Sequence, residues 1–464
     1  MPVNHLESWI SLQIGLPRKT VLSRPALLDW QRTRLLETVA LLRRRSPWYR
    51  GRLQGLSLGG HWDIQQILQT LPFTTAADIR ERGLEMVCCS QAEIQRVISL
   101  YSSGTSAPPK RLFFTADDLE RTKEFFQHGM RLVSAPGKTV LVLLPAERPN
   151  DVGTLLGEAL LHGGFSAAQL WPAHDTTELA SRVHSLGAQC LVGMPQHILP
   201  LARNLELTER VGSSLESILL CSDLTVPAVR QAIARSLNCR VQLHYGSTES
   251  GLGGAVECAA GLGCHIREND LLFEVIDPET GYSVPEEADG ELVFTTLTRR
   301  GMPLIRYRTG DRGRMTSKRC PCGSILSRLQ NLQGRFRDTV RLKGGGTLSL
   351  ADLDQALLSH SQITAFEAEL RDEITAQAQA VPVEILRITL MPSPQASQEL
   401  EGLVRESLLS IPAIQRALST GGFRIQFAQS AHHPNPSHTV KRKLGDARGS
   451  RKGSIGIGQG LLPG

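Results

Sequence analysis

Residues 139–192 read TVLVLLPAERPNDVGTLLGEALLHGGFSAAQLWPAHDTTELASRVHSLGAQCLV, and this stretch decides the fold of the chain. Short apolar runs at Thr139–Leu144, Gln169–Trp171 and Cys190–Val192 alternate with amphipathic segments at Val152–Leu161 and Thr177–Leu186. Apolar runs of this length are typical of buried strands, and the segments between them are typical of crossover helices. The stretch therefore predicts an α/β domain built on a parallel sheet.

The predicted sheet continues downstream and then changes character. Further apolar runs follow at Ile218–Leu220 and Val241–His244. From Leu272 onward the pattern alternates, and the segment FEVIDPETGYSVPEEADGELVFTTL, residues 273–297, carries turn residues at Pro278–Gly281. Alternation with turn signals predicts antiparallel strands, so we expect a smaller antiparallel β region after the parallel one.

The two ends of the chain differ from this centre. Residues 1–100 look mainly helical, with apolar residues at helical spacing over Leu27–Leu42. In the last quarter we expect a helix at Leu350–Leu358 and strands at Ala365–Leu370 and Leu386–Leu390. This mixture predicts a small α+β domain at the C-terminal end.

Composition and charge bound what the chain can do. It has 464 residues and a net charge of +6, of which residues 441–452 alone contribute +5, so a nucleic-acid-binding body is not implied. The longest apolar strand, Val140–Pro145, is far too short to cross a bilayer, and the first residues lack a signal pattern. We therefore expect a cytoplasmic protein that binds neither nucleic acid nor membrane. A homodimer is one possible assembly. We divide it into a large domain over 1–333, a small mobile domain over 334–446 and a disordered Gly-rich tail over 447–464.

Four segments carry side chains that could bind a nucleotide or take part in catalysis: SSGTSAPPK at 102–110, HYGSTES at 244–250, RYRTGD at 306–311 and GRFRDTVRLKGG at 334–345. Small hydroxylated residues, glycine and a lysine can approach and neutralise phosphate oxygens. A tyrosine at a strand end can stack on a flat base, and a glutamate can hold Mg²⁺ through oxygen. An aspartate after a tight glycine turn can accept both hydroxyls of a ribose. Taken singly, each segment also fits an ordinary turn or a basic linker.

The order and spacing of the four segments together are more specific. With them the chain resembles the adenylate-forming, acyl-CoA synthetase-like superfamily, over roughly residues 25–445. LPFTT at 71–75 and MPLIRYRTGD at 302–311 are similar to motifs of its phenylacetate-CoA ligase-like branch. The resemblance implies that ATP activates a small carboxylic acid to an acyl-adenylate, and that coenzyme A then displaces AMP.

The resemblance also implies roles for particular residues. The phosphates of ATP would be cradled by Ser102, Ser103, Gly104, Thr105 and Lys110. The nucleoside would be bound by Ser222, Asp223, Tyr245, Gly246 and Asp311, with Arg335 beside the ribose. Thr248 and Glu249 would handle the α-phosphate and Mg²⁺. The lysine that the family delivers to the reacting oxygens matches Lys441, with Lys443 as a competing register.

A separate set of cysteines and a histidine predicts a metal site. Two cysteines in RCPCG and a distant Cys/His group can supply three sulfurs and one nitrogen to Zn²⁺, and similar sequences of the branch carry this pattern. We expect a structural Zn²⁺ on Cys258, His265, Cys320 and Cys322, with Cys264 as a spare. Adjacent free thiols without a metal are the alternative.

Several positions depart from the family pattern and keep other functions open. Ala107 replaces a glycine of the phosphate loop, Arg337 occupies the hinge position, and LKGGGTLSLADLD at 342–354 replaces a segment near the coenzyme A site. An adenylyltransferase that forms no thioester, or a degenerate ATP/AMP sensor, therefore remains an alternative to the ligase. By register, the acyl pocket would be lined by Phe126, His128, Gly251 and Gly254, which do not identify the acid.

Overall fold

The computed structural model describes residues 4–18, 20–100, 108–173, 175–211, 214–373, 383–394, 396–430, 442 and 444–448. The side chains of Leu205 and Arg337 are not among the described parts. The described residues divide into two compact units, the first up to Arg337 and the second from Asp338 onward.

A parallel array forms one half of the large sheet in the first unit. Its strand order is β4–β3–β5–β6–β7, with bounds β3 (Thr139–Leu143), β4 (Ser166–Gln169), β5 (Cys190–Gly193), β6 (Ser217–Leu220) and β7 (Arg240–Tyr245). The parallel α/β prediction is therefore confirmed. One strand lies a few residues earlier than predicted: β4 ends at Gln169, whereas we expected a strand over Gln169–Trp171. Trp171 is followed by Pro172, which has no N–H to donate to a neighbouring strand.

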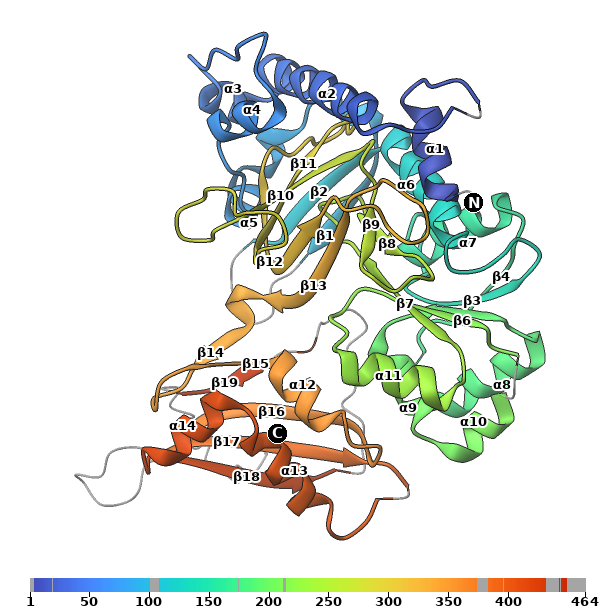
Figure 1. The fold of residues 1–464 in the computed structure, drawn as a ribbon, viewed down its shortest axis with the longest axis vertical. Coiled ribbons are helices and arrows are strands. Elements are labelled where there is room, and N and C mark those ends of the chain that lie inside the picture. The colour runs from blue at the N-terminus through green and yellow to red at the C-terminus, as the bar shows by residue number, and fades with distance from the viewer. Residues whose placement is uncertain are drawn as a thin grey trace, which may run out of the picture. The chain divides into compact units, whose positions relative to one another are not determined.

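Helices connect these strands, as the alternating pattern predicts. They are α7 (Val152–His162), α8 (Thr176–Leu186), α9 (Pro195–Ala202), α10 (Leu205–Val211) and α11 (Pro227–Ser236). In Figure 1 they flank β3, β4, β6 and β7. The strands β3 and β5 are almost wholly buried, which explains their unbroken apolar sequence.

The same sheet continues without a break into antiparallel strands. These are β8 (Ala255–Glu257), β9 (Cys264–Ile266), β10 (Leu271–Ile276), β11 (Gly290–Thr296), β12 (Tyr307–Thr316) and β13 (Arg328–Arg335). The hairpin of β10 and β11 confirms the antiparallel prediction for residues 273–297. Within the described residues, eleven strands form one sheet, and β7 joins its two halves by pairing with β6 on one side and β8 on the other.

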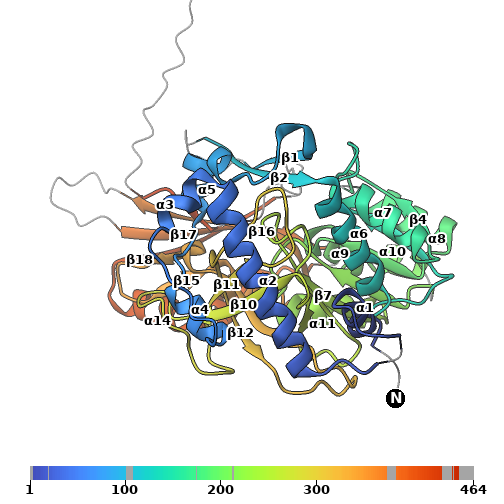
Figure 2. The same cartoon turned by 90° about the horizontal axis from the view of Figure 1, so that it is seen from above.

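The N-terminal part is helical as predicted and packs on this sheet. It contains α1 (His5–Gln13), α2 (Arg24–Arg45), α3 (Pro47–Arg52), α4 (Ile64–Thr70) and α5 (Ala76–Arg82). Figure 2 shows α2 lying across the antiparallel strands β10 and β11, where Thr38 donates to the carbonyl of Leu297. A two-stranded sheet of β1 (Ile94–Leu100) and β2 (Lys110–Thr115) then leads into α6 (Ala116–Met130).

The second unit is a small α+β body. A four-stranded sheet of order β18–β17–β16–β19 combines β16 (Ile363–Glu373), β17 (Val383–Pro392), β18 (Phe423–Gln429) and β19 (Gly445–Asp446). A hairpin of β14 (Thr339–Arg341) and β15 (Thr347–Ser349) precedes α12 (Leu350–Leu357), and α13 (Leu400–Leu409) and α14 (Pro412–Ser419) complete the unit. The buried Glu384 is paired there with Arg448 at 2.6 Å.

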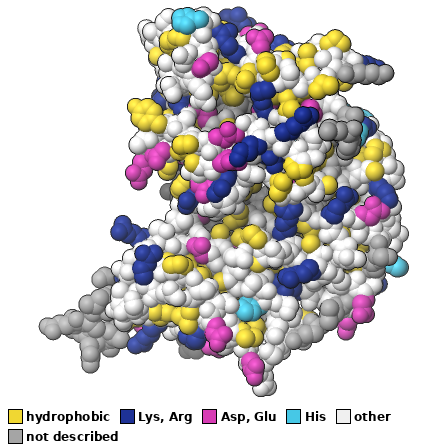
Figure 3. Space-filling model, viewed as in Figure 1, with side chains coloured by type: hydrophobic (Ala, Val, Ile, Leu, Met, Phe, Trp, Pro, Cys, Tyr) yellow, Lys and Arg dark blue, Asp and Glu magenta, His cyan; other side chains and the backbone are white. Residues whose placement is uncertain are grey.

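Two surface properties bear on function. Lysine and arginine side chains are interspersed with acidic ones over the face in Figure 3. Within the described ranges, no helix combines the length and apolar character that crossing a bilayer requires.

Candidate active site

Two parallel strands deliver the first part of the site to one edge of the sheet. β6 and β7 are neighbours, so the loops that follow their carboxyl ends begin side by side. Ser222 and Asp223 follow β6, and Gly246 and Thr248 follow β7. Gly246 is required by space, because a Cβ atom there would lie 2.7 Å from His244 Cε1 and 2.8 Å from the carbonyl oxygen of Leu252.

Glu249 is the buried acidic centre of this edge. Its side chain forms an ion pair with Lys110, the first residue of β2, and accepts a hydrogen bond from the Tyr307 hydroxyl at 2.8 Å. Burial alone would raise the pKa of Glu249, but the charge and hydrogen bond of Lys110, together with the hydrogen bonds from Tyr307 and from the Glu249 main chain, outweigh it and lower the pKa to about 2. Glu249 is therefore a carboxylate at neutral pH, which is the form that a hard cation binds.

Asp311 lies within β12 and is held from two sides. Tyr245 donates to its Oδ2 atom at 2.8 Å, and Arg335 Nε donates to its Oδ1 atom at 3.0 Å. The two strands β12 and β13 pair so that Asp311 and Arg335 are direct partners. The carboxylate is thus fixed in orientation at the same edge as the β7 loop.

The remaining predicted residues divide into those that the structure places and those that it does not. Ser102, Ser103, Gly104, Thr105 and Lys441 lie outside the described residues, as do Ala107 and Lys443. Of the expected acyl-pocket residues, Phe126 is buried 6.2 Å from the Phe125 ring. His128 stacks on Trp9 at 5.5 Å.

Sequence reasoning missed Tyr307 and Arg299 as site residues. Tyr307 lies inside the RYRTGD segment, but only its aspartate was assigned a role. Arg299 donates to the main-chain carbonyl of Glu249 at 2.6 Å, and no motif signals it. The position of Tyr307 within a recognised motif was the available signal for the first, whereas the second depends on how distant strands pack.

The predicted zinc residues form a compact cluster. One ligand atom from each of Cys258, His265, Cys320 and Cys322 lies within 4.8 Å of the others. The sulfur atoms of Cys258 and Cys320 are 3.8 Å apart, and Cys322 Sγ lies 3.5 Å from His265 Nε2. A tetrahedron with metal–sulfur bonds of about 2.3 Å has edges of about 3.8 Å, so these separations suit Zn²⁺.

The fifth cysteine of this region is engaged elsewhere. Cys264 donates to the carbonyl of Leu243 at 3.4 Å. The Cys258 thiol and the His265 ring hold the pKa of the Cys322 thiol well below its usual range, and a thiolate is the form that binds a metal. The donor set of the cluster therefore fits a closed, structural Zn²⁺ site.

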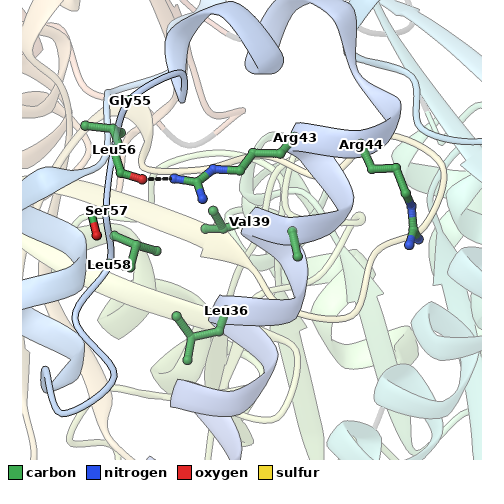
Figure 4. A pocket seen from close by; sticks show the side chains of 9 residues that line it. Leu36, Val39, Arg43, Arg44, Gly55, Leu56, Ser57 and Leu58 are labelled. Carbon is green, nitrogen blue, oxygen red and sulfur yellow. Dashed lines mark hydrogen bonds between the residues drawn. The ribbon is translucent and has the colours of Figure 1, made fainter.

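A separate pocket of about 770 Å³ lies far from these motifs in the sequence (Figure 4). It is bounded by α2 and the loop after α3, and Arg43 donates to the carbonyl of Leu56 across it. Leu36, Val39 and Leu58 give it an apolar wall. Because none of the motif residues line it, we place the candidate active site at the convergence of the motifs instead.

Comparison with known proteins gives a consistent result. A family model described as AMP-binding enzyme matches residues 66–297, half of the chain. Phenylacetate-coenzyme A ligase of Thermus thermophilus is 30% identical over 384 residues, which cover 77% of this chain and 84% of that protein. Phenylacetate-coenzyme A ligase of Escherichia coli K12 is 25% identical over 60% of this chain and 63% of that protein. A crystal structure of 2-hydroxyisobutyryl-CoA ligase with 2-HIB-AMP shares the fold, with a TM-score of 0.74, 19% identity, and coverage of 91% of this chain and 89% of that one.

Proposed function

Because the chain belongs to the AMP-binding enzyme family, with phenylacetate-coenzyme A ligases among its relatives, we propose that it is an AMP-forming acid–CoA ligase. It activates a small carboxylic acid with ATP and transfers the acyl group to coenzyme A. The observation that carries this proposal is the convergence of Lys110, Glu249 and Tyr307, which belong to three motifs far apart in the sequence. Ordinary surface turns or linkers, by contrast, are not expected to place their polar side chains together around one buried carboxylate.

In the first half-reaction a carboxylate oxygen of the acid attacks the α-phosphorus of ATP. A bond forms between that oxygen and phosphorus, the bond to the bridging oxygen breaks, and pyrophosphate leaves. Two anions meet in this step, so cationic groups must neutralise the developing charge. Lys110 supplies one such charge, and Lys441 is proposed to supply another. Mg²⁺, when bound, neutralises phosphate oxygens, and Glu249 and Thr248 are the residues proposed to hold it.

Asp311 is proposed to bind the ribose of ATP, with Arg335 and Tyr245 holding the carboxylate in place. Ser222, Asp223 and Gly246 would line the adenine pocket at the same sheet edge. In the second half-reaction the coenzyme A thiol gives its proton to water and its sulfur forms a bond to the acyl carbon. The bond from that carbon to the phosphate oxygen breaks, and AMP leaves with the bonding electrons. The small domain is proposed to move between the two half-reactions.

We propose a structural role for Zn²⁺ at Cys258, His265, Cys320 and Cys322. Four protein ligands would close the coordination shell, so the ion would hold β9 and the loop before β13 together rather than take part in catalysis. The separations between the ligand atoms support this proposal.

The proposal is tested by ATP–pyrophosphate exchange across a panel of carboxylic acids, with coenzyme A consumption measured in parallel. At least one acid should drive exchange, and coenzyme A should then be consumed with release of AMP. Exchange with a trapped adenylate and no use of coenzyme A would identify an adenylyltransferase. Tight ATP binding without exchange for any acid would identify a nucleotide sensor.

A further inference from the structure

Two tyrosines tie the two nucleotide motifs together in a crossed arrangement. Tyr245, in the segment 244–250, donates to Asp311 in the segment 306–311. In the opposite direction, Tyr307 of the segment 306–311 donates to Glu249 of the segment 244–250. We propose that Tyr307 is a positioning residue that fixes the Glu249 carboxylate for Mg²⁺-dependent ATP binding, as Tyr245 fixes Asp311. The inference rests on the proposed function, because it takes Glu249 as the carboxylate that faces the metal.

The contacts of Glu249 favour this role for Tyr307. Both side chains are buried, with 5% of Glu249 and 3% of Tyr307 exposed. The Tyr307 hydroxyl and the Lys110 ammonium group both contact the Oε1 atom of Glu249, and neither of these contacts uses Oε2. The Tyr307 hydroxyl also lies 3.4 Å from Lys110 Nζ. The same neutral hydroxyl therefore donates to Oε1 of Glu249 and contacts the Lys110 ammonium group.

The hydroxyls of the two tyrosines are held in place by a row of packed rings. The Tyr307 and Phe294 centroids are 5.4 Å apart, those of Phe294 and Phe273 are 5.6 Å apart, and those of Phe273 and Tyr245 are 6.1 Å apart. The rings come from β12, β11, β10 and β7, and the strand register pairs Phe294 with both Tyr307 and Phe273. Phe273, Phe294 and Tyr307 are buried and in tilted contact, and the half-buried Tyr245 ring meets Phe273 edge-on. Rings packed in this way have few alternative positions, so the two hydroxyls are fixed relative to each other.

The main chain of the Glu249 loop is held by other groups, which isolates the contribution of Tyr307. Arg299 donates to the carbonyl of Glu249 at 2.6 Å, and Arg267 donates to the carbonyl of Ser250 at 2.9 Å. Gly251 leaves room for both guanidinium groups, because a Cβ there would lie 2.6 Å from Arg299 Nη2 and 3.2 Å from Arg267 Nη2. The arginines therefore hold the backbone of the loop, and Tyr307 orients the carboxylate.

The test uses ATP binding, which needs no acid substrate, and compares the Tyr307→Phe variant with the parent protein. Calorimetric titration is carried out with saturating Mg²⁺ and again with EDTA. Loss of one hydrogen bond to a charged group should weaken ATP binding about tenfold in Mg²⁺ and leave it nearly unchanged in EDTA. An equal loss in both conditions, or no loss in either, would overturn the inference.

Two further variants separate positioning from a general loss of structure. Tyr49→Phe is the matched control, because Tyr49 is a buried tyrosine whose hydroxyl contacts the Thr74 hydroxyl and accepts from the Ile305 N–H, and neither of these described partners is a carboxylate. It should lower the melting temperature without changing the Mg²⁺ dependence of ATP binding. In a Glu249→Gln background, Tyr307→Phe should add no further Mg²⁺-specific loss, and an additive loss would mean that Tyr307 acts by another route.

The ATP titration and the ATP–pyrophosphate exchange assay together distinguish failure of the inference from failure of the proposed function. If no acid supports exchange but Tyr307→Phe shows the Mg²⁺-specific loss, the ligase proposal fails and the positioning role stands. If exchange occurs and the Mg²⁺ dependence is unchanged by Tyr307→Phe, only the positioning role fails. If the parent protein binds no ATP, both are wrong.

Discussion

Arg335 Nε donates to Asp311 Oδ1 at 3.0 Å, only two residues before the first compact unit ends at Arg337. The other oxygen of the same carboxylate accepts from Tyr245 at 2.8 Å. Asp311 is therefore oriented by one cationic and one neutral donor, each on its own oxygen. Charge-assisted bonds of this kind are stronger than neutral ones, so the orientation of Asp311 is well defined.

Replacing Asp311 with asparagine should weaken ATP binding by a factor of ten or more. An asparagine presents an NH2 group in place of one carboxylate oxygen, so either Tyr245 or Arg335 then faces a donor instead of an acceptor, and the charge that suits ribose hydroxyls is lost. Binding of ATP and of inorganic tripolyphosphate, which has no ribose, should be compared by calorimetry. The tripolyphosphate affinity should change little, and an equal loss for both ligands would place Asp311 away from the ribose.

The pair of Lys110 and Glu249 predicts a pH-dependent stability effect. In the parent protein the pKa of Glu249 is about 2, below the ordinary value of 4.5, so the pair stabilises the fold above about pH 4.5. That stabilisation is lost as the pH falls toward 2. In Lys110→Met, the charge and hydrogen bond that most strongly lower the pKa of Glu249 are gone, so its folded-state pKa should rise above 4.5 and its charge should become destabilising at neutral pH.

We therefore expect Lys110→Met to lower the free energy of unfolding by about 3–5 kcal/mol at neutral pH, the usual cost of an unpaired buried charge. The gap in melting temperature to the parent should narrow as the pH is lowered from 8 to about 5, because the carboxylate then takes up a proton. The control is the double variant Lys110→Met/Glu249→Gln. The difference in melting temperature between it and the single variant Glu249→Gln should not depend on pH. A constant gap for Lys110→Met would contradict the assigned pairing.

Much of the fold could be predicted from the sequence because its strands have simple patterns. The runs that form β3, β5 and β6 are buried and mainly apolar, and the hairpin of β10 and β11 alternates around a clear turn. The boundary of β4 was less accurate, because Trp171 continues the apolar run although the ladder has already ended. Periodicity reports burial, and it does not report where hydrogen bonding between strands stops.

The site was predictable in its motifs and unpredictable in its contacts. Glu249 and Asp311 stand out by type and spacing, whereas the donation from Tyr307 to Glu249 depends on the register that sets Tyr307 opposite Phe294. Register is a property of paired strands far apart in the chain, so a single motif does not contain it. Arg299 reaches the same loop from a segment with no recognisable pattern.

Lys441 remains a prediction, since it lies outside the described residues, and it can be tested directly. Lys441→Ala should reduce ATP–pyrophosphate exchange at least a hundredfold while ATP binding stays within a few-fold of the parent, because a delivered cation acts on the developing charge. Lys443→Ala is the matched control and should retain exchange. The reverse result, loss with Lys443→Ala alone, would move the reacting lysine to the competing register.

The cysteine and histidine cluster predicts about one zinc ion per chain in protein purified without chelators. Cys258→Ser should abolish metal binding, since it removes a ligand from a four-ligand shell. Cys264→Ser should retain the metal, because its sulfur contacts the Leu243 carbonyl instead. Elemental analysis of the three proteins checks this prediction, and a metal-free parent protein would show that the cluster consists of free thiols.

The N-terminal helix is tied to the loop that carries this cluster. Asn4 Nδ2 donates to Cys322 Sγ at 3.4 Å, and Glu7 accepts from the Ser324 hydroxyl at 2.6 Å and from the Ile325 N–H at 2.8 Å. A loop that loses its metal loses the constraint on Cys322, and α1 then loses the partners that hold its first turn. Removal of the metal should therefore loosen α1 although it contributes no metal ligand.

Hydrogen exchange measures this coupling segment by segment. Chelation should increase amide exchange at least tenfold in residues 5–13, while β3 in the parallel sheet keeps its protection. Glu7→Gln weakens the tie without touching a metal ligand, so it should speed exchange in α1 even in the metal-loaded protein. If chelation left exchange in α1 unchanged while zinc was released, the helix would be held independently of the cluster, by contacts such as the stacking of Trp9 on His128.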